Sequence, residues 1–252
     1  MAGAQTLAGL RVLVTRPAAQ AESLCGQLSA RGAQVSRLPL QRIEFINTPA
    51  LAIRLRSLRS ASLWIFTSVN AVSGARALDQ GAWPACAAIG EATAQALRQV
   101  AGVEALRPEA QYDSEGLLAL PVLQNIQGRE IVLISGQGGR GVLEPALIAR
   151  GARLVRLDVY RRLPLVHAAA DLGRALEGLD AIIITSGEAL MQFFAQLTPA
   201  QRAQVLRVQL VVPSARVVEH ARQMGFKRAP RIASPISDVG YVHALEAWWT
   251  LD

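Results

Sequence analysis

One pattern occurs twice in this chain, and the distance between its copies is that of a whole domain. The run F-T-S-V-N-A-V, which contains Phe66-Thr67-Ser68, matches I-T-S-G-E-A-L around Ile184-Thr185-Ser186, 118 residues later. Two predicted helices, which start at residues 89–93 and 212–216 and end at Gly102 and Gly225, match at about the same distance. A repeat of about 120 residues is far longer than a solenoid unit and fits a small domain. The 252 residues therefore predict two similar domains.

Each half combines strands with helices. Residues 11–15 and 34–40 are predicted strands, and the segment between them carries apolar residues at a helical period. Residues 131–134 and 153–160 repeat this order. Short strands that alternate with amphipathic helices predict an α/β fold in which each domain is a parallel sheet flanked by helices. Because residues 38–40 and 158–160 are equivalent strand exits, we expect the chain to cross between the domains there.

Small polar residues follow many of the predicted strands. Residues 112–117, which contain such residues, align with residues 234–239 in the second copy of the repeat. In an open parallel sheet, ligands bind at the carboxyl ends of the strands, where helix N-termini favour anions. The candidate ligand-binding residues of this kind are Thr67, Ser68, Asn70, Thr93, Ser114, Thr185, Ser186, Ser214 and Ser234. Each is also an ordinary helix-capping type. Their occurrence at matched positions in both halves predicts a ligand site rich in hydrogen-bond donors.

The most literal motif is G-x-G-x-x-G at residues 136–141, between a predicted strand and a predicted helix. Asp158 ends the next strand, close to where a ribose-binding acid lies in dinucleotide-binding proteins. The equivalent turn of the first half, Thr15-Arg16-Pro17, contains no glycine, and Arg140 stands where an anionic group would approach. A dinucleotide site remains an alternative interpretation.

The formal net charge of +7 comes almost entirely from arginine, since Lys227 is the only lysine. Guanidinium groups bind carboxylates or phosphates through two N–H groups at once, so an anionic ligand is expected. Nucleic acid is a poorer fit, because the arginines are scattered and only 5% of the residues are aromatic.

Several other classes of protein are disfavoured. Cys25 and Cys86 lie far apart, which indicates neither a disulfide framework nor a thiolate zinc site and fits a reducing cytoplasm. The three histidines share no metal-ligand spacing. No apolar run in the sequence is long enough to span a bilayer. Residues 1–9 lack the charged segment followed by an apolar segment that is typical of a signal peptide. Among acid candidates, Tyr160 at the predicted domain crossing, followed by Arg161-Arg162, is the best placed.

Several motifs together resemble the uroporphyrinogen-III synthase family. They are V-T-R-P at 14–17, T-S-x-N at 67–70, I-G-x-A-T-A at 89–94, S-E-G-L at 114–117, G-G-R at 138–140 and D-V-Y-R-R at 158–162. The resemblance runs from about Leu10 to the C-terminus. The order and spacing of these motifs, more than any single motif, make the match specific.

The resemblance implies two α/β domains joined by a two-stranded linker. Residues 1–37 and 164–252 would form the first domain, residues 41–159 the second, and residues 38–40 and 160–163 the linker strands. It also implies conversion of hydroxymethylbilane, a linear tetrapyrrole with eight carboxylates, to uroporphyrinogen III, with inversion of ring D, loss of water, and no cofactor or metal. A cytoplasmic monomer that receives its substrate from hydroxymethylbilane synthase fits this interpretation.

The resemblance also assigns roles to residues. Tyr160 corresponds to the tyrosine proposed to assist departure of the hydroxyl, and Thr93 and Ser186 correspond to a threonine and a serine of the family's cleft. Many members have Gly and Thr where this chain has residues 213–216. The matching motifs add six substrate-binding candidates, namely Arg16, Gly90, Gly116, Gly138, Gly139 and Arg140. A nucleotide-dependent oxidoreductase and a two-lobed anion-binding protein without chemistry are the remaining alternatives.

Overall fold

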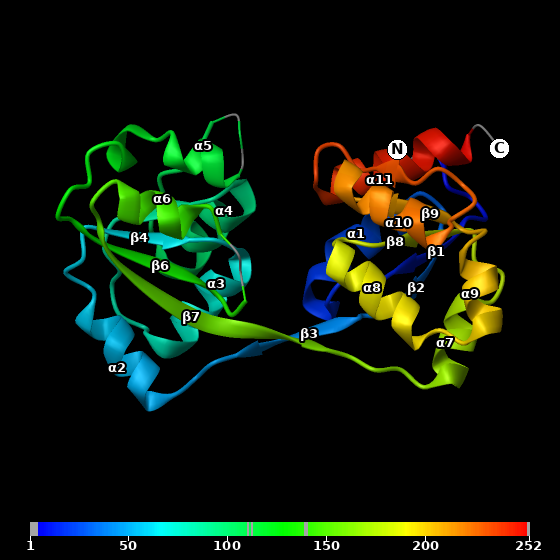
Figure 1. Cartoon of the computed structure of the whole chain (residues 1–252), viewed down its shortest axis with the longest axis horizontal. Helices are drawn as coiled ribbons and strands as arrows, with labels where there is room; N and C mark the ends of the chain where they lie inside the picture. The colour runs from blue at the N-terminus through cyan, green and yellow to red at the C-terminus, as the bar shows by residue number, and fades with distance from the viewer. Residues whose placement is uncertain (1–4, 110, 112, 139–140, 251–252) are drawn as a thin grey trace. The chain divides into compact units, whose positions relative to one another are not determined.

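The computed structural model describes residues 5–109, 111, 113–138 and 141–250. By its internal contacts the chain divides into two compact units, Met1–Arg42 with Leu163–Asp252 and Ile43–Arg162. The first unit is thus built from two separate stretches of the chain, whereas the second is continuous. Each unit holds one five-stranded sheet with helices on both of its faces (Figure 1).

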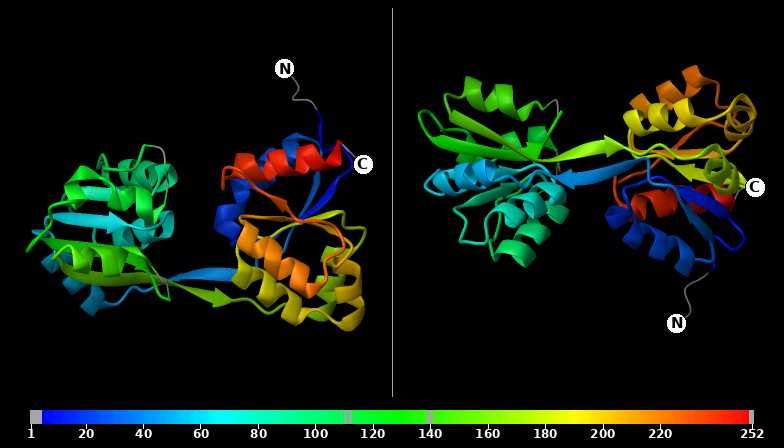
Figure 2. Two further views of the ribbon diagram at one scale, coloured as in Figure 1. Left: turned by 45° about the horizontal axis from the view of Figure 1, so that its top comes forward. Right: turned by 90° about the horizontal axis from the view of Figure 1, so that it is seen from below.

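The first unit has the strand order β10-β9-β8-β1-β2, and the pairs along it are parallel. Its elements are β1 (Arg11–Val14), α1 (Ala18–Ala30), β2 (Gln34–Arg37), α7 (Ala169–Leu176), β8 (Ala181–Ile183), α8 (Gly187–Gln196), α9 (Pro199–Val205), β9 (Gln209–Val212), α10 (Ala215–Met224), β10 (Arg231–Ile232) and α11 (Asp238–Trp249). Alternation along β1 sends Leu13 into the core under α7 to α10 and Val12 and Val14 into the core under α1 and α11. Figure 2 shows α1 (blue) and α11 (red) on one face of this sheet, with the yellow and orange helices on the other.

The second unit has the strand order β3-β7-β6-β4-β5, and β7, β6, β4 and β5 pair in parallel. Its elements are β3 (Gln41–Phe45), α2 (Pro49–Ser57), β4 (Leu63–Phe66), α3 (Val69–Leu78), β5 (Cys86–Ala88), α4 (Glu91–Ala101), α5 (Ser114–Leu118), the 3₁₀ turn η1 (Pro121–Leu123), β6 (Glu130–Gly136), α6 (Leu143–Ala149) and β7 (Arg153–Pro164). Trp64 and Phe66 of β4 pack under α2 to α4, whereas Leu63 and Ile65 pack under α5 and α6.

These sheets confirm the predicted α/β class with parallel strands flanked by helices. The matched sequence runs fall on equivalent strands, because T-S follows β4 in one unit and β8 in the other. Gly102 and Gly225 end α4 and α10 as predicted, each in the left-handed conformation that a glycine adopts without a Cβ penalty. Among the described helices, none is long and apolar enough to cross a membrane.

The predicted strand over residues 34–40 is too long. β2 ends at Arg37, and residues 38–40, expected as one of the linker strands, belong to no strand. Backbone hydrogen bonds to the chain around β1 continue past the end of β2, since Leu38 N donates to Val14 O at 3.0 Å and Leu40 N donates to Thr15 O at 3.2 Å. Pro39 lies between them, at the edge of the sheet, where its missing N–H removes no bond to β1. β7, in contrast, runs without a break through the strand predicted over residues 153–160 and the strand expected over residues 160–163, and ends at Pro164.

The starts of α5 and α11 correct the register of the repeat. The Asp113 carboxylate accepts from Gly116 N at 2.9 Å, and Ser237 Oγ accepts from Gly240 N at 3.3 Å. A Cβ atom on either glycine would lie 1.9 Å from a carbonyl oxygen of the preceding loop. Gly116 and Gly240 are therefore equivalent positions of the repeat. The alignment of residues 112–117 with residues 234–239 that the sequence suggested is wrong by two residues, because the capping geometry determines which positions correspond. The Gly116 N–H also holds the pKa of Asp113 below its usual value.

Candidate active site

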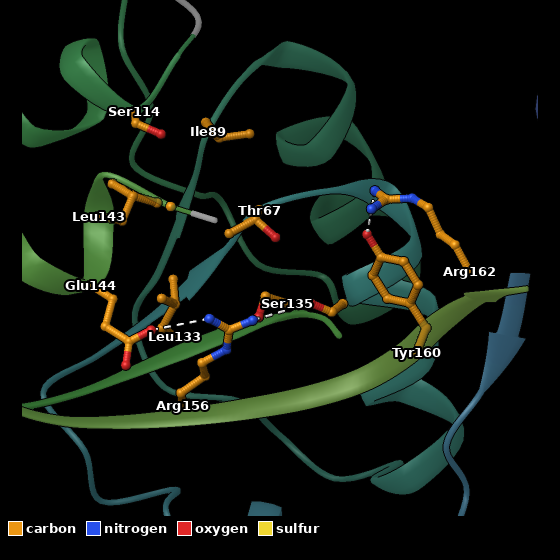
Figure 3. Close-up of a pocket in the computed structure, with 12 residues that line it drawn as sticks. Thr67, Ile89, Ser114, Leu133, Ser135, Leu143, Glu144, Arg156, Tyr160 and Arg162 are labelled. Atoms are coloured by element: carbon orange, nitrogen blue, oxygen red, sulfur yellow. Dashed lines mark hydrogen bonds and ion pairs between the residues drawn. The ribbon is translucent and has the colours of Figure 1, made fainter. Parts of the chain in front are cut away.

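A cavity of about 220 Å³ opens at the carboxyl ends of β4, β5, β6 and β7, within the second unit (Figure 3). Open parallel sheets place their ligand sites at this edge. The residues lining the cavity are Thr67, Ile89, Ser114, Leu133, Ser135, Gly136, Gly141, Leu143, Glu144, Arg156, Tyr160 and Arg162. Apolar side chains, hydroxyl groups and charged groups all contribute to its wall.

The hydroxyl group of Tyr160 is held by two neighbouring side chains. The Tyr160 side chain is only 2% exposed, and its hydroxyl lies 3.1 Å from Ser68 Oγ and accepts from Arg162 Nη2 at 3.1 Å. Ser68 is itself fixed, because its Oγ caps α3 by accepting from Ala71 N at 3.2 Å. A phenol oriented from two sides, at the edge of a cavity, is placed to exchange a proton with a bound ligand.

The Tyr160 ring explains why the first residue of the G-x-G-x-x-G motif is a glycine. Gly136 ends β6, and a Cβ atom there would lie 2.4 Å from Cζ of Tyr160, inside the ring's contact distance. Asp158, the acid expected near a ribose, accepts from Ser135 Oγ at 2.9 Å and from Arg156 Nε at 3.0 Å. Both features of the dinucleotide alternative thus have partners within the protein.

Arg156 forms the floor of the cavity and is bound by the protein's own acids. Its Nη1 lies 3.0 Å from Glu144 Oε2, and its Nη2 donates to Gly136 O at 3.3 Å (Figure 3). Hydrogen bonds from this guanidinium to Glu144 and Asp158 raise the pKa of Arg156 above its usual value. The cluster rigidifies the end of β6 and the start of α6, because it joins β7 to both.

The cavity brings together some of the candidates predicted in the second unit. Thr67, Ser114 and Tyr160 line it, and Ser68 contacts it through the Tyr160 hydroxyl. Gly138, at a φ of +77°, follows the end of β6 and is not among the lining residues.

The other candidates in the second unit have structural positions. Gly90 is the N-cap residue of α4, and Thr93 is 5% exposed inside that helix. Asn70 lies in the first turn of α3, and Gly116 is required by the loop before α5. Gly139 and Arg140 lie outside the described residues.

The candidates of the first unit lie at the equivalent edge of its own sheet. Arg16 forms an ion pair with Asp238, and its guanidinium carbon lies 5.1 Å from the centroid of the Tyr241 ring. Burial raises the pKa of Tyr241 to about 12. Thr185 directly precedes Ser186, whose Oγ caps α8 by accepting from Ala189 N at 3.0 Å.

The last two candidates make fewer contacts. Ser214 stands at the N-cap of α10 without a side-chain capping bond, and Ser234 is exposed, before a cis peptide bond to Pro235. A separate hollow in the first unit, between the starts of α8 and α10, includes none of the predicted residues. Its lining consists of Gly187, Glu188, Met191, Arg216, Val217 and His220.

Sequence reasoning missed Ser135, Glu144 and Arg156. The available signal for Arg156 and Asp158 was a charged pair two residues apart among the apolar residues Leu154, Val155, Leu157 and Val159, which places both charged side chains on one face. Arg162 was noted only as a neighbour of Tyr160. Among the described residues, no group of three or more His, Cys, Asp or Glu side chains is arranged to hold a metal ion.

Comparison with known proteins identifies the family. A family model described as uroporphyrinogen-III synthase HemD matches residues 22–234. The uroporphyrinogen-III synthase of Salmonella typhimurium is 35% identical over 231 residues, which is 86% of this chain and 93% of that protein. The enzyme of the same name from Escherichia coli is 33% identical over 230 residues, with the same coverage of 86% and 93%.

Solved structures agree in fold. Uroporphyrinogen-III synthetase from Helicobacter pylori superposes with a TM-score of 0.65 at 13% identity, covering 96% of this chain and all of that one. A mutant uroporphyrinogen III synthase from Thermus thermophilus gives 0.61 at 22% identity, covering 95% of this chain and 100% of its own. The structures support the α/β fold, and the family model and the two bacterial relatives settle the membership: this chain belongs to the uroporphyrinogen-III synthase family.

Proposed function

We propose that this chain is a hydro-lyase that cyclises hydroxymethylbilane to uroporphyrinogen III, with inversion of ring D and loss of water. The chain belongs to a family of that activity, and one observation in the structure carries the proposal. The Tyr160 hydroxyl group is held at the edge of the cavity by Ser68 and Arg162. The predicted anionic ligand agrees with it, since the substrate bears eight carboxylates and the chain has a formal net charge of +7.

The chemistry asks little of the side chains. The pyrroles of the bilane expel the hydroxyl group to form an azafulvene, and ring closure passes through a spiro intermediate. Tyr160 donates a proton to the departing hydroxyl, which leaves as water. The resulting phenolate is stabilised by the Arg162 guanidinium, whose N–H already points at that oxygen, until a proton released by the substrate on ring closure restores the phenol. Most of the rate enhancement then comes from positioning, with modest general-acid help.

The remaining predicted residues are proposed to bind substrate. Thr67 and Ser114 offer hydroxyl groups inside the cavity, and Arg16 with Ser186 stands at the equivalent sheet edge of the first unit. We also propose that the two compact units are the family's two domains, with the chain passing between them in β3 and β7. The unit boundaries after Arg42 and Arg162, inside those two strands, support this.

The cellular setting is part of the proposal. A monomer in the cytoplasm, receiving hydroxymethylbilane directly from hydroxymethylbilane synthase, accounts for an enzyme whose substrate closes without assistance to the type I isomer. Both cysteines are buried free thiols, and burial raises the pKa of Cys86 to about 12, which suits a reducing compartment.

The test is incubation with freshly made hydroxymethylbilane, followed by oxidation and chromatographic separation of the type I and type III porphyrins. We expect mainly type III with the protein and type I in a protein-free control. The same product ratio and rate in both samples would overturn the proposed function. A rise in NAD(P)H fluorescence on titration with the protein would favour the nucleotide-dependent alternative instead.

A further inference from the structure

Of the arginines that the structure describes, Arg156 and Arg162 line the cavity, and they differ in what they already bind. Arg156 directs Nε to Asp158, Nη1 to Glu144 and Nη2 to Gly136 O, so each of its nitrogens faces a protein oxygen at 3.0 to 3.3 Å. A carboxylate from a ligand would have to displace two carboxylates of the protein to reach it. Arg156 is therefore a structural cation and a poor receptor for an anionic substrate.

Arg162 is placed differently, at the exposed side of the Tyr160 ring. Its Nη2 donates to the Tyr160 hydroxyl at 3.1 Å, and its guanidinium carbon lies 5.5 Å from the centroid of that ring. Within the described part of the chain, it forms no ion pair with an Asp or Glu. A guanidinium has five N–H donors, so most of those of Arg162 remain for a ligand.

The hydrogen-bond roles around Tyr160 follow from the same contact. An arginine cannot accept, so the Tyr160 oxygen accepts from Arg162, and its own proton is directed elsewhere. Ser68 Oγ, 3.1 Å away, is already an acceptor from Ala71 N and can exchange the donor role with Tyr160. Arg162 thus leaves the phenol proton free to point to Ser68 or to a bound ligand.

This inference rests on the proposed function: we propose that Arg162 is the substrate-positioning residue of this cavity. It binds a carboxylate side chain of the tetrapyrrole with its remaining N–H groups while it holds the Tyr160 hydroxyl with Nη2. Carboxylates are attached to the pyrroles through short side chains, so a carboxylate on Arg162 brings its ring and the adjoining hydroxymethyl group to Tyr160. One guanidinium then sets the distance between the leaving group and its acid.

Arg161 provides the matched control. It is the next residue of β7, so its side chain lies on the opposite face of the strand from Tyr160 and Arg162, where it forms an ion pair with Glu44. Arg161→Gln and Arg162→Gln remove the same charge from neighbouring positions. Arg162→Lys keeps the charge and loses the planar fork.

The experiment measures KM and kcat of each variant with fresh hydroxymethylbilane, after thermal unfolding has shown that the variants are folded. Arg162→Gln is expected to raise KM about tenfold or more and also to lower kcat, because it removes a charge-assisted contact. Arg162→Lys is expected to be intermediate, and Arg161→Gln to stay within about twofold of wild type. In a Tyr160→Phe background, Arg162→Gln is expected to keep its effect on KM and to lose its effect on kcat.

The outcomes separate the two proposals. A wild-type protein that makes no type III product overturns the proposed function and this inference with it. Normal wild-type turnover with an unchanged KM in Arg162→Gln, or the same KM in Arg161→Gln and Arg162→Gln, overturns the role of Arg162 alone. Loss of the KM effect in the Tyr160→Phe background would also overturn carboxylate binding, since the guanidinium would then act only through the phenol.

Discussion

Gly136 and Tyr160 are directly opposed across β6 and β7, and the tyrosine ring occupies the space that any side chain at position 136 would fill. The distance of 2.4 Å between a Cβ at Gly136 and Cζ of Tyr160 is too short to be relieved without moving the ring or the strand. This pair therefore couples a strand-end glycine to the placement of the phenol hydroxyl.

Gly136→Ala is expected to displace the Tyr160 ring and to lower kcat by no more than loss of the hydroxyl group itself would, which is about 100-fold or less. Steady-state turnover checks this. Gly26→Ala is the control, because Gly26 is an exposed residue of α1 with no atom within 4 Å of the new Cβ. That variant is expected to keep full activity and to gain about 0.5–1 kcal/mol of stability. Equal activity of Gly136→Ala and wild type would show that the ring has room to move.

Tyr160→Phe keeps the packing of the ring and removes only the donor. General acids typically contribute 10²–10⁴-fold, and because this hydroxyl leaves readily we expect a loss of about 100-fold or less. The product should remain type III, because positioning of ring D and not the acid selects the isomer. Porphyrin-isomer chromatography reads both quantities. Full turnover of Tyr160→Phe would show that Tyr160 is only a packing residue. Mainly type I product would show that Tyr160 controls the orientation of ring D instead.

The serines at helix starts differ in what their side chains bind, and stability measurements should separate them. Ser186→Ala loses the capping bond to Ala189 N and is expected to lower the free energy of unfolding by about 1 kcal/mol. Ser214→Ala occupies the same position on α10 but loses no such bond, so a smaller change is expected. Denaturant unfolding measures both. Equal losses would contradict the capping role of Ser186.

Asp79 predicts a pH-dependent part of the stability. Its burial would raise the pKa, but hydrogen bonds from Arg59 and Gly81 N outweigh this, so the pKa of Asp79 is lowered in the folded protein. A lowered folded pKa stabilises the protein above the unfolded value of about 3.9, and the contribution disappears as the pH falls through the folded pKa. Asp79→Asn should therefore be less stable than wild type at pH 7, with the gap closing below about pH 4. Urea unfolding at several pH values tests this, and a gap independent of pH would contradict it.

Local signals in the sequence were sufficient for much of the fold. Gly102 and Gly225 marked helix ends, and Thr67-Ser68 marked the edge of a sheet, because caps and strand exits depend on neighbouring residues. The charged pair of Arg156 and Asp158 is visible in the sequence, but the partners that complete the cluster, Ser135, Glu144 and Gly136 O, were not predictable in this way. Their arrangement depends on β7 lying next to β6 with a register shift at Ser135/Gly136, and sheet order is a property of the whole chain.

The strand order of the first unit also bears on how the protein is made. β1 pairs with β2 on one side and with β8 on the other, and β8 emerges from the ribosome only after the whole of Ile43–Arg162 has been synthesised. Until then, one edge of β1 has no partner, and such an edge invites pairing with other chains. The continuous unit, by contrast, contains all the strands of its own sheet except the start of β3 and the end of β7, and domains generally fold as they are completed during synthesis. The nascent chain therefore acquires its Tyr160 cavity before the sheet that begins at its own N-terminal end is closed.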